Sequence, residues 1–168
     1  MDMGLKNKVA LVTGAGRGIG ADIARKLAAE GCRVVVCDRD ETPATSVAQS
    51  IAQSLGSALA LTVDVSSRTS VQAAVAQAEI TFGTVEILVN NAGFSQDAPL
   101  EEMTDEQWDS VIHVNLKGSW LCSQAVVKGM KSLGKGRIIN IASRALLGEN
   151  RKSNYCAANA GIMGLTKA

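Results

Sequence analysis

The stretch Thr13-Gly14-Ala15-Gly16-Arg17-Gly18-Ile19-Gly20 has the residue types that bind phosphate groups. It follows a short apolar run of strand character and opens a segment with helical periodicity. Backbone N–H groups and the positive end of a helix can hold an anion there, and glycine lets the backbone approach it because it has no Cβ. A plain tight turn is the alternative. The position between a strand and a helix favours a pyrophosphate site.

Asp38 ends the next apolar run, 18 residues beyond Gly20. A carboxylate at this point can accept hydrogen bonds from the ribose hydroxyls of an adenosine, and it would repel a 2′-phosphate. These properties predict NAD as the cofactor. Arg17 and Arg39 favour NADP instead, because either guanidinium could pair with a 2′-phosphate, so both cofactors stay open. The alternative to cofactor binding is that Asp38 is an ordinary turn residue and that the two arginines are solvated surface residues.

The elements that must position these residues alternate along the chain. Short β-branched runs alternate with longer stretches of helical period, which is typical of βαβ units around a parallel sheet. We expect strands at Val9 to Thr13, Arg33 to Cys37, Leu59 to Val63, Ile87 to Asn90 and Arg137 to Ile141. We expect helices from Ile19 to Gly31, Pro43 to Leu55, Val71 to Gly83, Thr104 to Ser132, and from a cap at Ser153 or Asn154 onward. The pattern predicts one α/β domain over residues 1–168.

Composition narrows the function classes. The chain has 168 residues, 46% of them apolar, which suffices for one packed domain. Lys and Arg number 17 against 16 Asp and Glu, and only five residues are aromatic. This balance argues against a nucleic-acid or anionic-membrane surface and favours small-molecule or protein partners. No apolar run approaches the roughly 18 residues that span a bilayer, and the N-terminus has no apolar signal region, so a cytoplasmic protein is predicted.

No metal site is predicted. Cys32, Cys37, Cys122 and Cys156 show no C-x-x-C spacing and lie in apolar runs, as buried free thiols do. His113 is the only histidine and is expected to be a packed or surface residue of the long helix. Trp108 and Trp120 on that helix are expected to pack in the core or between subunits.

Two further motifs follow expected strands. Asp64-Val65 comes after the third strand, and Asn90-Asn91-Ala92-Gly93 ends the fourth. With Thr13 to Gly20, they resemble the adenine-contacting Asp-Val pair, the N-N-A-G signature and the T-G-x-x-x-G-x-G turn of the short-chain dehydrogenases/reductases, including the 3-oxoacyl-carrier-protein reductases. The resemblance implies a doubly wound parallel sheet, the Rossmann fold, with strand order 3-2-1-4-5. The expected cofactor-binding residues are Gly14, Gly16, Arg17, Gly18, Ile19, Gly20, Asp38, Arg39, Asp64, Val65, Asn91, Ala92, Gly93, Tyr155 and Asn159.

The same family places catalytic residues where this chain has Asn115, Ser143 and, twelve residues later, Tyr155. The resemblance implies an oxidoreductase that transfers a hydride between a nicotinamide cofactor and an alcohol/ketone pair. Tyr155 would be the acid/base on the substrate oxygen, and Ser143 would donate a hydrogen bond to that oxygen. Without the resemblance, Asn115 could be a hydrated helix residue and Ser143 a loop hydroxyl that caps backbone.

The fourth catalytic position of the family differs here. The family has Y-x-x-x-K, whereas this chain reads Tyr155-Cys156-Ala157-Ala158-Asn159. Residues i and i+4 share a helix face, and an ammonium about 5 Å from a phenolate stabilises it by about 3 kcal/mol at an effective dielectric constant of ~20. Asn159 supplies no charge, although its amide can bond the nicotinamide ribose. Loss of the lysine would also break the water relay that the family organises through the residue matching Asn115. Arg151 and Lys152 are alternative sources of charge.

Two functional hypotheses follow. The first is an oxidoreductase weakened at position 159, by nature or by replacement of a lysine. The second is a NAD(P)-binding module without turnover, either a pseudo-enzyme or a truncated fragment. Family members run to roughly 250 residues, the last helix here lacks a glycine cap, and the fifth strand would expose an apolar edge. We therefore expect the C-terminal strands to be missing. The helices that hold Asn115 and Tyr155 could pair subunits in a homo-oligomer.

Overall fold

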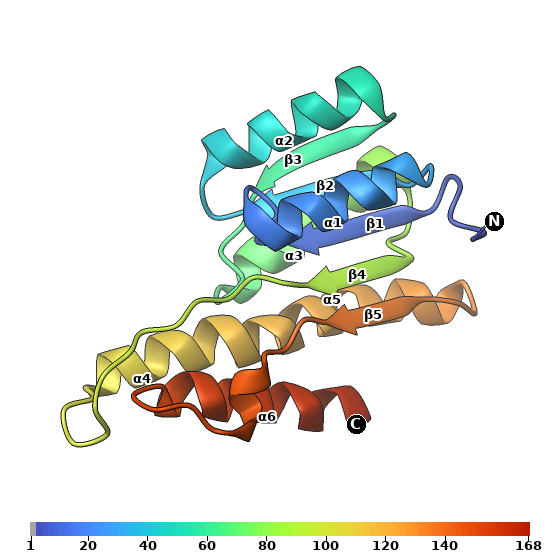
Figure 1. Ribbon diagram of the computed structural model, residues 1–168. Coiled ribbons are helices and arrows are strands. Elements are labelled where there is room, and N and C mark those ends of the chain that lie inside the picture. Colours follow the sequence, from blue (N-terminus) through green and yellow to red (C-terminus); the bar gives the residue numbers. More distant parts are fainter. Residues whose placement is uncertain (1–2) are drawn as a thin grey trace.

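Five parallel strands form one sheet in the computed structural model, which describes residues 3–168. The strands are β1 (Val9–Thr13), β2 (Arg33–Asp38), β3 (Ala58–Thr62), β4 (Ile87–Asn90) and β5 (Arg137–Asn140). Their order is β3-β2-β1-β4-β5, so the predicted Rossmann arrangement is confirmed (Figure 1). The first two residues of the predicted domain lie outside the described residues.

Helices connect the strands and continue beyond the last one. They are α1 (Gly18–Ala29), α2 (Glu41–Ser54), α3 (Arg68–Phe82), α4 (Asp105–Val111), the π-helical segment η1 (Ile112–Lys117), α5 (Gly118–Ser132), the 3-10 helix η2 (Arg144–Leu147) and α6 (Ser153–Lys167). Helix α2 begins two residues before Pro43, with Asp40 as its N-cap. Proline fits any position of the first turn because the N–H groups there have no partner within the helix, so it did not mark the start.

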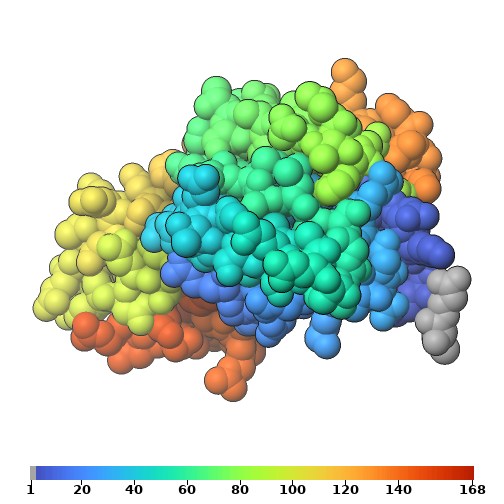
Figure 2. All heavy atoms as spheres, turned by 90° about the horizontal axis from the view of Figure 1, so that it is seen from above, coloured from blue at the N-terminus to red at the C-terminus, as the bar shows by residue number. Residues whose placement is uncertain are grey.

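Two apolar clusters hold helices on opposite faces of the sheet. One cluster joins β1, β2 and β4 to α3 and α5, and the other joins the same strands to α1 and α2 (Figure 1). Every residue of β1 and β4 is buried, as expected for central strands of a parallel sheet covered on both faces. In the view from above, the segments around α4 (yellow) and α6 (red) extend away from this body (Figure 2).

The predicted long helix from Thr104 is present but changes geometry in its middle. Thr104 and Gln107 form the expected capping box at the start of α4. The chain then takes π-helical pitch in η1 before α5 resumes the α-helix. Asn115 lies inside η1, and its side chain bonds the backbone of Phe94. Such a π segment often marks a functional residue, and sequence periodicity does not reveal it.

The N-cap of helix α6 is neither of the two expected residues, Ser153 and Asn154, but lies just before them. Lys152 is its N-cap, and Ser153 and Asn154 are its first two residues. The Asn154 side chain is fully buried and donates to the carbonyls of Gln96 and Gln107. Asn154 therefore fastens the loop after β4 and α4 to α6.

The cysteines, the tryptophans and His113, which the sequence assigned to packing or to the surface, differ in their exposure. Cys32, Cys37 and Cys122 are buried as predicted, whereas Cys156 is partly exposed. Burial raises the pKa of the Cys122 thiol to about 12. It also raises the pKa of Cys32 and of Cys37 above the ordinary value. Trp108 and Trp120 are 38% and 40% exposed, so they do not pack in the core, and the alternative of packing between subunits stays a prediction. His113 is an exposed helix residue whose Nδ1 lies 2.7 Å from the Asp109 carbonyl oxygen.

One edge of the sheet stays apolar within the described chain. Strand β5 pairs with β4 alone, and its residues Ile138 and Ile139 are exposed. Among residues 3–168, no helix is both long enough and apolar enough to cross a bilayer.

Candidate functional site

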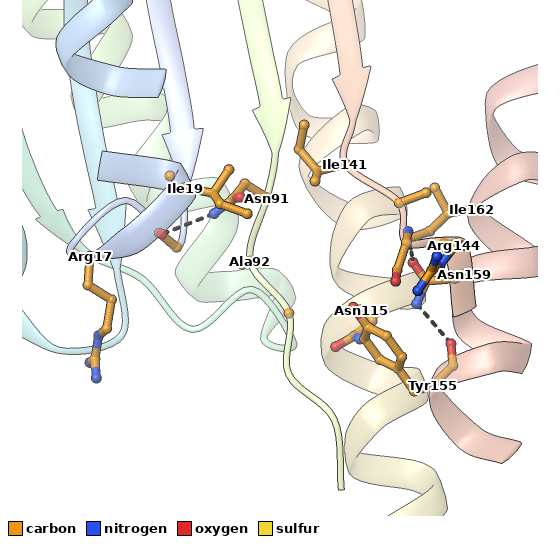
Figure 3. Close-up of a pocket in the computed structure, with 15 residues that line it drawn as sticks. Arg17, Ile19, Asn91, Ala92, Asn115, Ile141, Arg144, Tyr155, Asn159 and Ile162 are labelled. Carbon is orange, nitrogen blue, oxygen red and sulfur yellow. Dashed lines mark hydrogen bonds between the residues drawn. The ribbon is translucent and has the colours of Figure 1, made fainter. Parts of the chain in front are cut away.

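A cavity of about 560 Å³ opens at the carboxyl ends of β1 and β4 (Figure 3). The chain winds in opposite directions from these two neighbouring strands, and ligands of doubly wound sheets bind at this switch point. The lining residues are Gly14, Arg17, Ile19, Gly20, Asn91, Ala92, Gly93, Asn115, Ile141, Ala142, Ser143, Arg144, Tyr155, Asn159 and Ile162. The cavity thus joins residues predicted to bind the cofactor with those predicted to be catalytic.

The glycine-rich turn forms one wall, and two of its positions leave no room for a side chain. A Cβ at Gly14, where φ is +61°, would lie 2.8 Å from Ala92 Cα, and one at Gly20 would lie 2.3 Å from the Gly14 carbonyl oxygen. The Asn91 amide donates to the carbonyls of Thr13 and Gly14 at 3.0 and 3.1 Å and ties the turn to β4. Helix α1 starts from this wall, so its unpaired N–H groups suit an anion.

Asp38 lies behind the turn rather than in the cavity lining. Its carboxylate accepts hydrogen bonds from the N–H of Gly16 at 2.9 Å and of Asp40 at 3.1 Å, and the residue is buried. Arg17 forms an ion pair with Asp40, and Arg39 Nε lies 3.8 Å from the same carboxylate. Asp40 therefore partly neutralises both arginines.

Five further residues that were predicted to bind the cofactor also lie outside the cavity lining. Gly16, Gly18, Arg39, Asp64 and Val65 do not line it. The Asp64 carboxylate accepts hydrogen bonds from the N–H and hydroxyl of Ser66, at 2.9 and 2.7 Å. Val65 is buried against Gly118, where an added Cβ would come within 2.9 Å of Val65 Cγ2. In this structure, both side chains fix loop and helix positions.

Asn115 fixes the wall beyond β4. Its Oδ1 accepts from the Phe94 N–H at 3.1 Å, and its Nδ2 donates to the Phe94 carbonyl at 2.9 Å. Gly93 packs against the same side chain, because a Cβ there would lie 3.3 Å from Asn115 Oδ1. The amide therefore holds the segment after β4 at the cavity.

Ser143, Tyr155 and Asn159 share the opposite wall, formed by α6 and the segment after β5. Figure 3 shows Tyr155 and Asn159 of this wall on α6. The Asn159 Oδ1 accepts from the Ser143 N–H at 2.7 Å, and its Nδ2 donates to the Tyr155 carbonyl at 2.9 Å. The Ser143 hydroxyl accepts from the Ala145 N–H at 3.2 Å, so it caps η2 while facing the cavity. The capping role that the sequence left open for Ser143 therefore occurs, and it leaves the hydroxyl proton free to donate.

Lys152 and Arg151, the two alternative sources of positive charge near Tyr155, differ in their surroundings. Lys152 forms an ion pair with Glu149, and its Nζ lies 3.9 Å from Asp97. The hydrogen bond to Glu149 raises the pKa of Lys152 above its ordinary value, and Asp97 and Tyr155 contribute in the same direction. Lys152 is therefore charged but compensated. Arg151 is exposed and has a positive φ of 63°.

Four lining residues were not predicted from the sequence: Ile141, Ala142, Arg144 and Ile162. Three of them lie within two residues of Ser143 in the chain, and Ile162 lies three residues after Asn159 on α6. Proximity to the two predicted residues was the available signal. Arg144 is exposed at the cavity, and within residues 3–168 it makes no ion pair.

The lining of the cavity suits a dinucleotide in its chemistry. One end offers a backbone cradle that side chains would fill, and the other offers hydroxyl groups of Ser143 and Tyr155. None of the lining residues is acidic, so nothing at the wall repels a pyrophosphate.

Comparisons with known proteins agree with this geometry. Residues 8–168 match the family model described as short chain dehydrogenase. The chain is 44% identical to the short-chain reductase protein NovJ of Streptomyces niveus over 162 residues. These aligned residues cover 96% of this chain and 62% of NovJ. It is 40% identical to D-threitol dehydrogenase of Mycolicibacterium smegmatis over 99% of this chain and 64% of that protein.

A third relative is the 3-oxoacyl-[acyl-carrier-protein] reductase FabG of Escherichia coli. It is 39% identical over 168 residues, which cover 99% of this chain and 67% of FabG. The chain thus spans between 62% and 67% of the lengths of these three relatives. A family match over nearly the whole chain, together with these identities, shows that the chain belongs to the short-chain dehydrogenase family.

Proposed function

We propose that this chain carries out NAD(P)-dependent hydride transfer between a nicotinamide cofactor and a small alcohol/ketone substrate. The observation that carries the proposal is the single cavity whose walls hold the glycine-rich turn on one side and Ser143 and Tyr155 on the other. A phosphate cradle and an acid/base hydroxyl in one cavity are the two parts that this reaction needs.

Different residues of the cavity would bind the cofactor and transfer the proton. A bound nicotinamide cofactor would supply or accept the hydride. The turn at Gly14 to Gly20 and the start of α1 would bind its pyrophosphate, and Asn91, Ala92 and Gly93 would lie along it. Tyr155 would donate its hydroxyl proton to the substrate oxygen in reduction and take it back in oxidation. Ser143 would donate a hydrogen bond to the same oxygen.

NAD is the cofactor that the electrostatics favour. Asp38 and Asp40 place two carboxylates beside the turn, and Asp40 already pairs with Arg17 and lies beside Arg39. A 2′-phosphate would have to approach these carboxylates and compete for the arginines. Calorimetric titration with NAD and NADP tests this preference, and a tighter affinity for NADP would contradict it.

A dehydrogenase assay with a panel of alcohols and ketones tests the activity. We expect nicotinamide absorbance to change with at least one substrate, and Tyr155→Phe to lower kcat by about 10²-fold or more while NAD binding is kept. The rival function, a NAD(P)-binding module without turnover, is motivated by the uncharged Asn159. Tight NAD binding with no absorbance change over the whole panel would favour that rival.

We also propose that α5 and α6 pair between copies of the chain. Trp120 and Val127 on α5 and Met163 on α6 are exposed apolar residues on the helices concerned. Sedimentation at increasing concentration checks the oligomeric state, and a chain that stays monomeric at high concentration would exclude this pairing.

A further inference from the structure

The Asn159 side chain is buried between two segments that hold proposed catalytic groups. It is 3% exposed, and both ends of its amide bond the backbone: the oxygen accepts from Ser143, at the end of the β5 segment, and the nitrogen donates to Tyr155, in α6. These bonds link residue 143 to residue 155 through one rigid planar group (Figure 3). The amide is therefore engaged inside the wall, where the sequence alone suggested a contact with the cofactor ribose.

We propose that Asn159 is a positioning residue that fixes the Ser143 backbone, and hence the direction of the Ser143 hydroxyl, relative to Tyr155. The proposal rests on the proposed function for its consequence in turnover, but the geometry itself does not depend on it. A carboxamide can accept and donate at the same time, which a lysine ammonium cannot do because it has no acceptor. In this chain, position 159 thus holds the wall together and contributes no charge to it.

A second bond between the same two elements provides a matched control. The Asn140 side-chain amide at the end of β5 donates to the Thr166 hydroxyl of α6 at 2.9 Å, away from the cavity lining. Asn159 and Thr166 therefore both tie α6 to β5 or the segment after it, but Asn159 alone bonds Ser143. Loss of general docking and loss of Ser143 positioning can be separated by comparing variants at these two positions.

Hydrogen exchange of the Ser143 amide, followed by NMR in the full chain, is the direct test. We expect Asn159→Leu to speed this exchange by about tenfold or more, because the N–H loses its buried acceptor. Asn159→Asp keeps an acceptor oxygen and should leave the exchange within about threefold of the original rate. Thr166→Val should leave it unchanged. If Asn159→Leu does not fold, Asn159→Ala removes the same bonds with less bulk.

Two results would overturn the proposal: Ser143 exchange that is unaffected by removal of the amide, or acceleration by Thr166→Val as large as that by Asn159→Leu. Where hydride transfer is measurable, Asn159→Leu should lower kcat at least about tenfold with the Kd for NAD nearly unchanged, because alignment and not cofactor binding is lost. If no variant transfers hydride, the proposed function fails, whereas the exchange rates still decide the positioning role.

Discussion

At the scale of single residues, side-chain amides organise this cavity. Asn91 holds the glycine turn, Asn115 holds Phe94, and Asn159 holds Ser143 and Tyr155, in each case through backbone groups. Asparagine is short, planar and able to donate and accept at once, so one side chain can satisfy two buried backbone partners. The walls are thereby fixed relative to one another without any charge in the lining other than Arg17 and Arg144.

The substitution Asn159→Lys tests how much a cation at this position would change kcat and the pH optimum. The ammonium would stabilise the phenolate form of Tyr155 by about 3 kcal/mol at an effective dielectric constant of ~20. Loss of the hydrogen bond to Ser143 opposes this by about 1.4 kcal/mol, which is the tenfold fall in kcat expected for Asn159→Leu. We therefore expect kcat to rise by about tenfold or more, and the pH optimum of alcohol oxidation to move down, because the base form becomes available at lower pH. Steady-state pH profiles of both proteins check this. Identical profiles would show that charge at position 159 plays no part.

Sequence reasoning found these residues but not their hydrogen-bond partners. The resemblance to the short-chain dehydrogenases/reductases was enough to predict that Asn115, Ser143 and Tyr155 share one site with the glycine turn. Which group accepts from the Ser143 N–H depends on how α6 packs in three dimensions. The position of Asp38 behind the turn depends likewise on how the turn packs. Arg144 was missed because its residue type indicates no cavity, and its position next to Ser143 was the only signal in the sequence.

At the scale of elements, the packing of α1 against the glycine-rich turn tolerates no side chain at Gly20, in the first turn of that helix. An added Cβ would lie 2.3 Å from the Gly14 carbonyl oxygen, which is backbone and cannot rotate away. We expect Gly20→Ala to lower the free energy of unfolding by about 2 kcal/mol and to weaken NAD binding at least about tenfold. Gly164→Ala in α6 is the control, because nothing lies within 4 Å of its Cβ, and it should raise stability by up to about 1 kcal/mol. Denaturant titration and calorimetry measure both. Equal effects of the two variants would contradict this account of the turn.

The opposite end of the sheet is held by an ion cluster at Glu86, just before β4. Its carboxylate lies 3.1 Å from Lys8 Nζ and 2.9 Å from Lys135 Nζ. Burial alone would raise the pKa of Glu86, but hydrogen bonds from Lys135 and Lys8 outweigh it and lower the pKa below its ordinary value. This carboxylate therefore links the segments before β1 and β5 to β4.

Glu86→Gln should lower the free energy of unfolding at neutral pH by about 1 kcal/mol. The folded-state pKa is below that of an unfolded glutamate, so the stabilisation is present above the unfolded value and is lost as the pH falls through the folded one. Denaturant titrations from neutral to acid pH should show the gap between the two proteins closing. Glu101→Gln, at an exposed turn residue, is the control and should show no gap. A gap for Glu86→Gln that persists in acid would exclude the ion cluster as its cause.

Element type was predictable, whereas element geometry was only partly so. The apolar runs gave all five strands within one residue at each end. The three inner strands β1, β2 and β4 are buried on both faces, which leaves continuous apolar runs in the sequence, and the edge strands β3 and β5 are short β-prone runs between helical segments. The change to π-helical pitch around Asn115 and the burial of Asn154 were not predicted. Both side chains bond backbone carbonyls of the loop after β4, which is distant in sequence. Local periodicity carries no information about such distant partners.

At the scale of the whole molecule, the sheet has two unlike edges. At β3 the side chains are half-buried or exposed beneath α2, and at β5 the exposed residues include Ile138 and Ile139. A parallel sheet edge with apolar side chains presents unpaired backbone groups and a surface that favours association with another chain. The net charge of +1 adds little repulsion between copies.

Ile139→Lys tests whether this edge governs the association of the 168-residue chain. Ile139 is 41% exposed on β5, and a lysine there keeps its charge in water while it discourages edge-to-edge pairing. We expect light scattering and sedimentation to show weaker concentration-dependent association than in the original chain, with unchanged unfolding midpoints. Ile80→Lys is the matched control, because Ile80 is 79% exposed on α3, away from any strand edge. If both lysines weaken association equally, exposed apolar area in general is responsible. A decrease confined to Ile139→Lys assigns the contact to β5 and separates it from pairing through α5 and α6, which this substitution leaves intact.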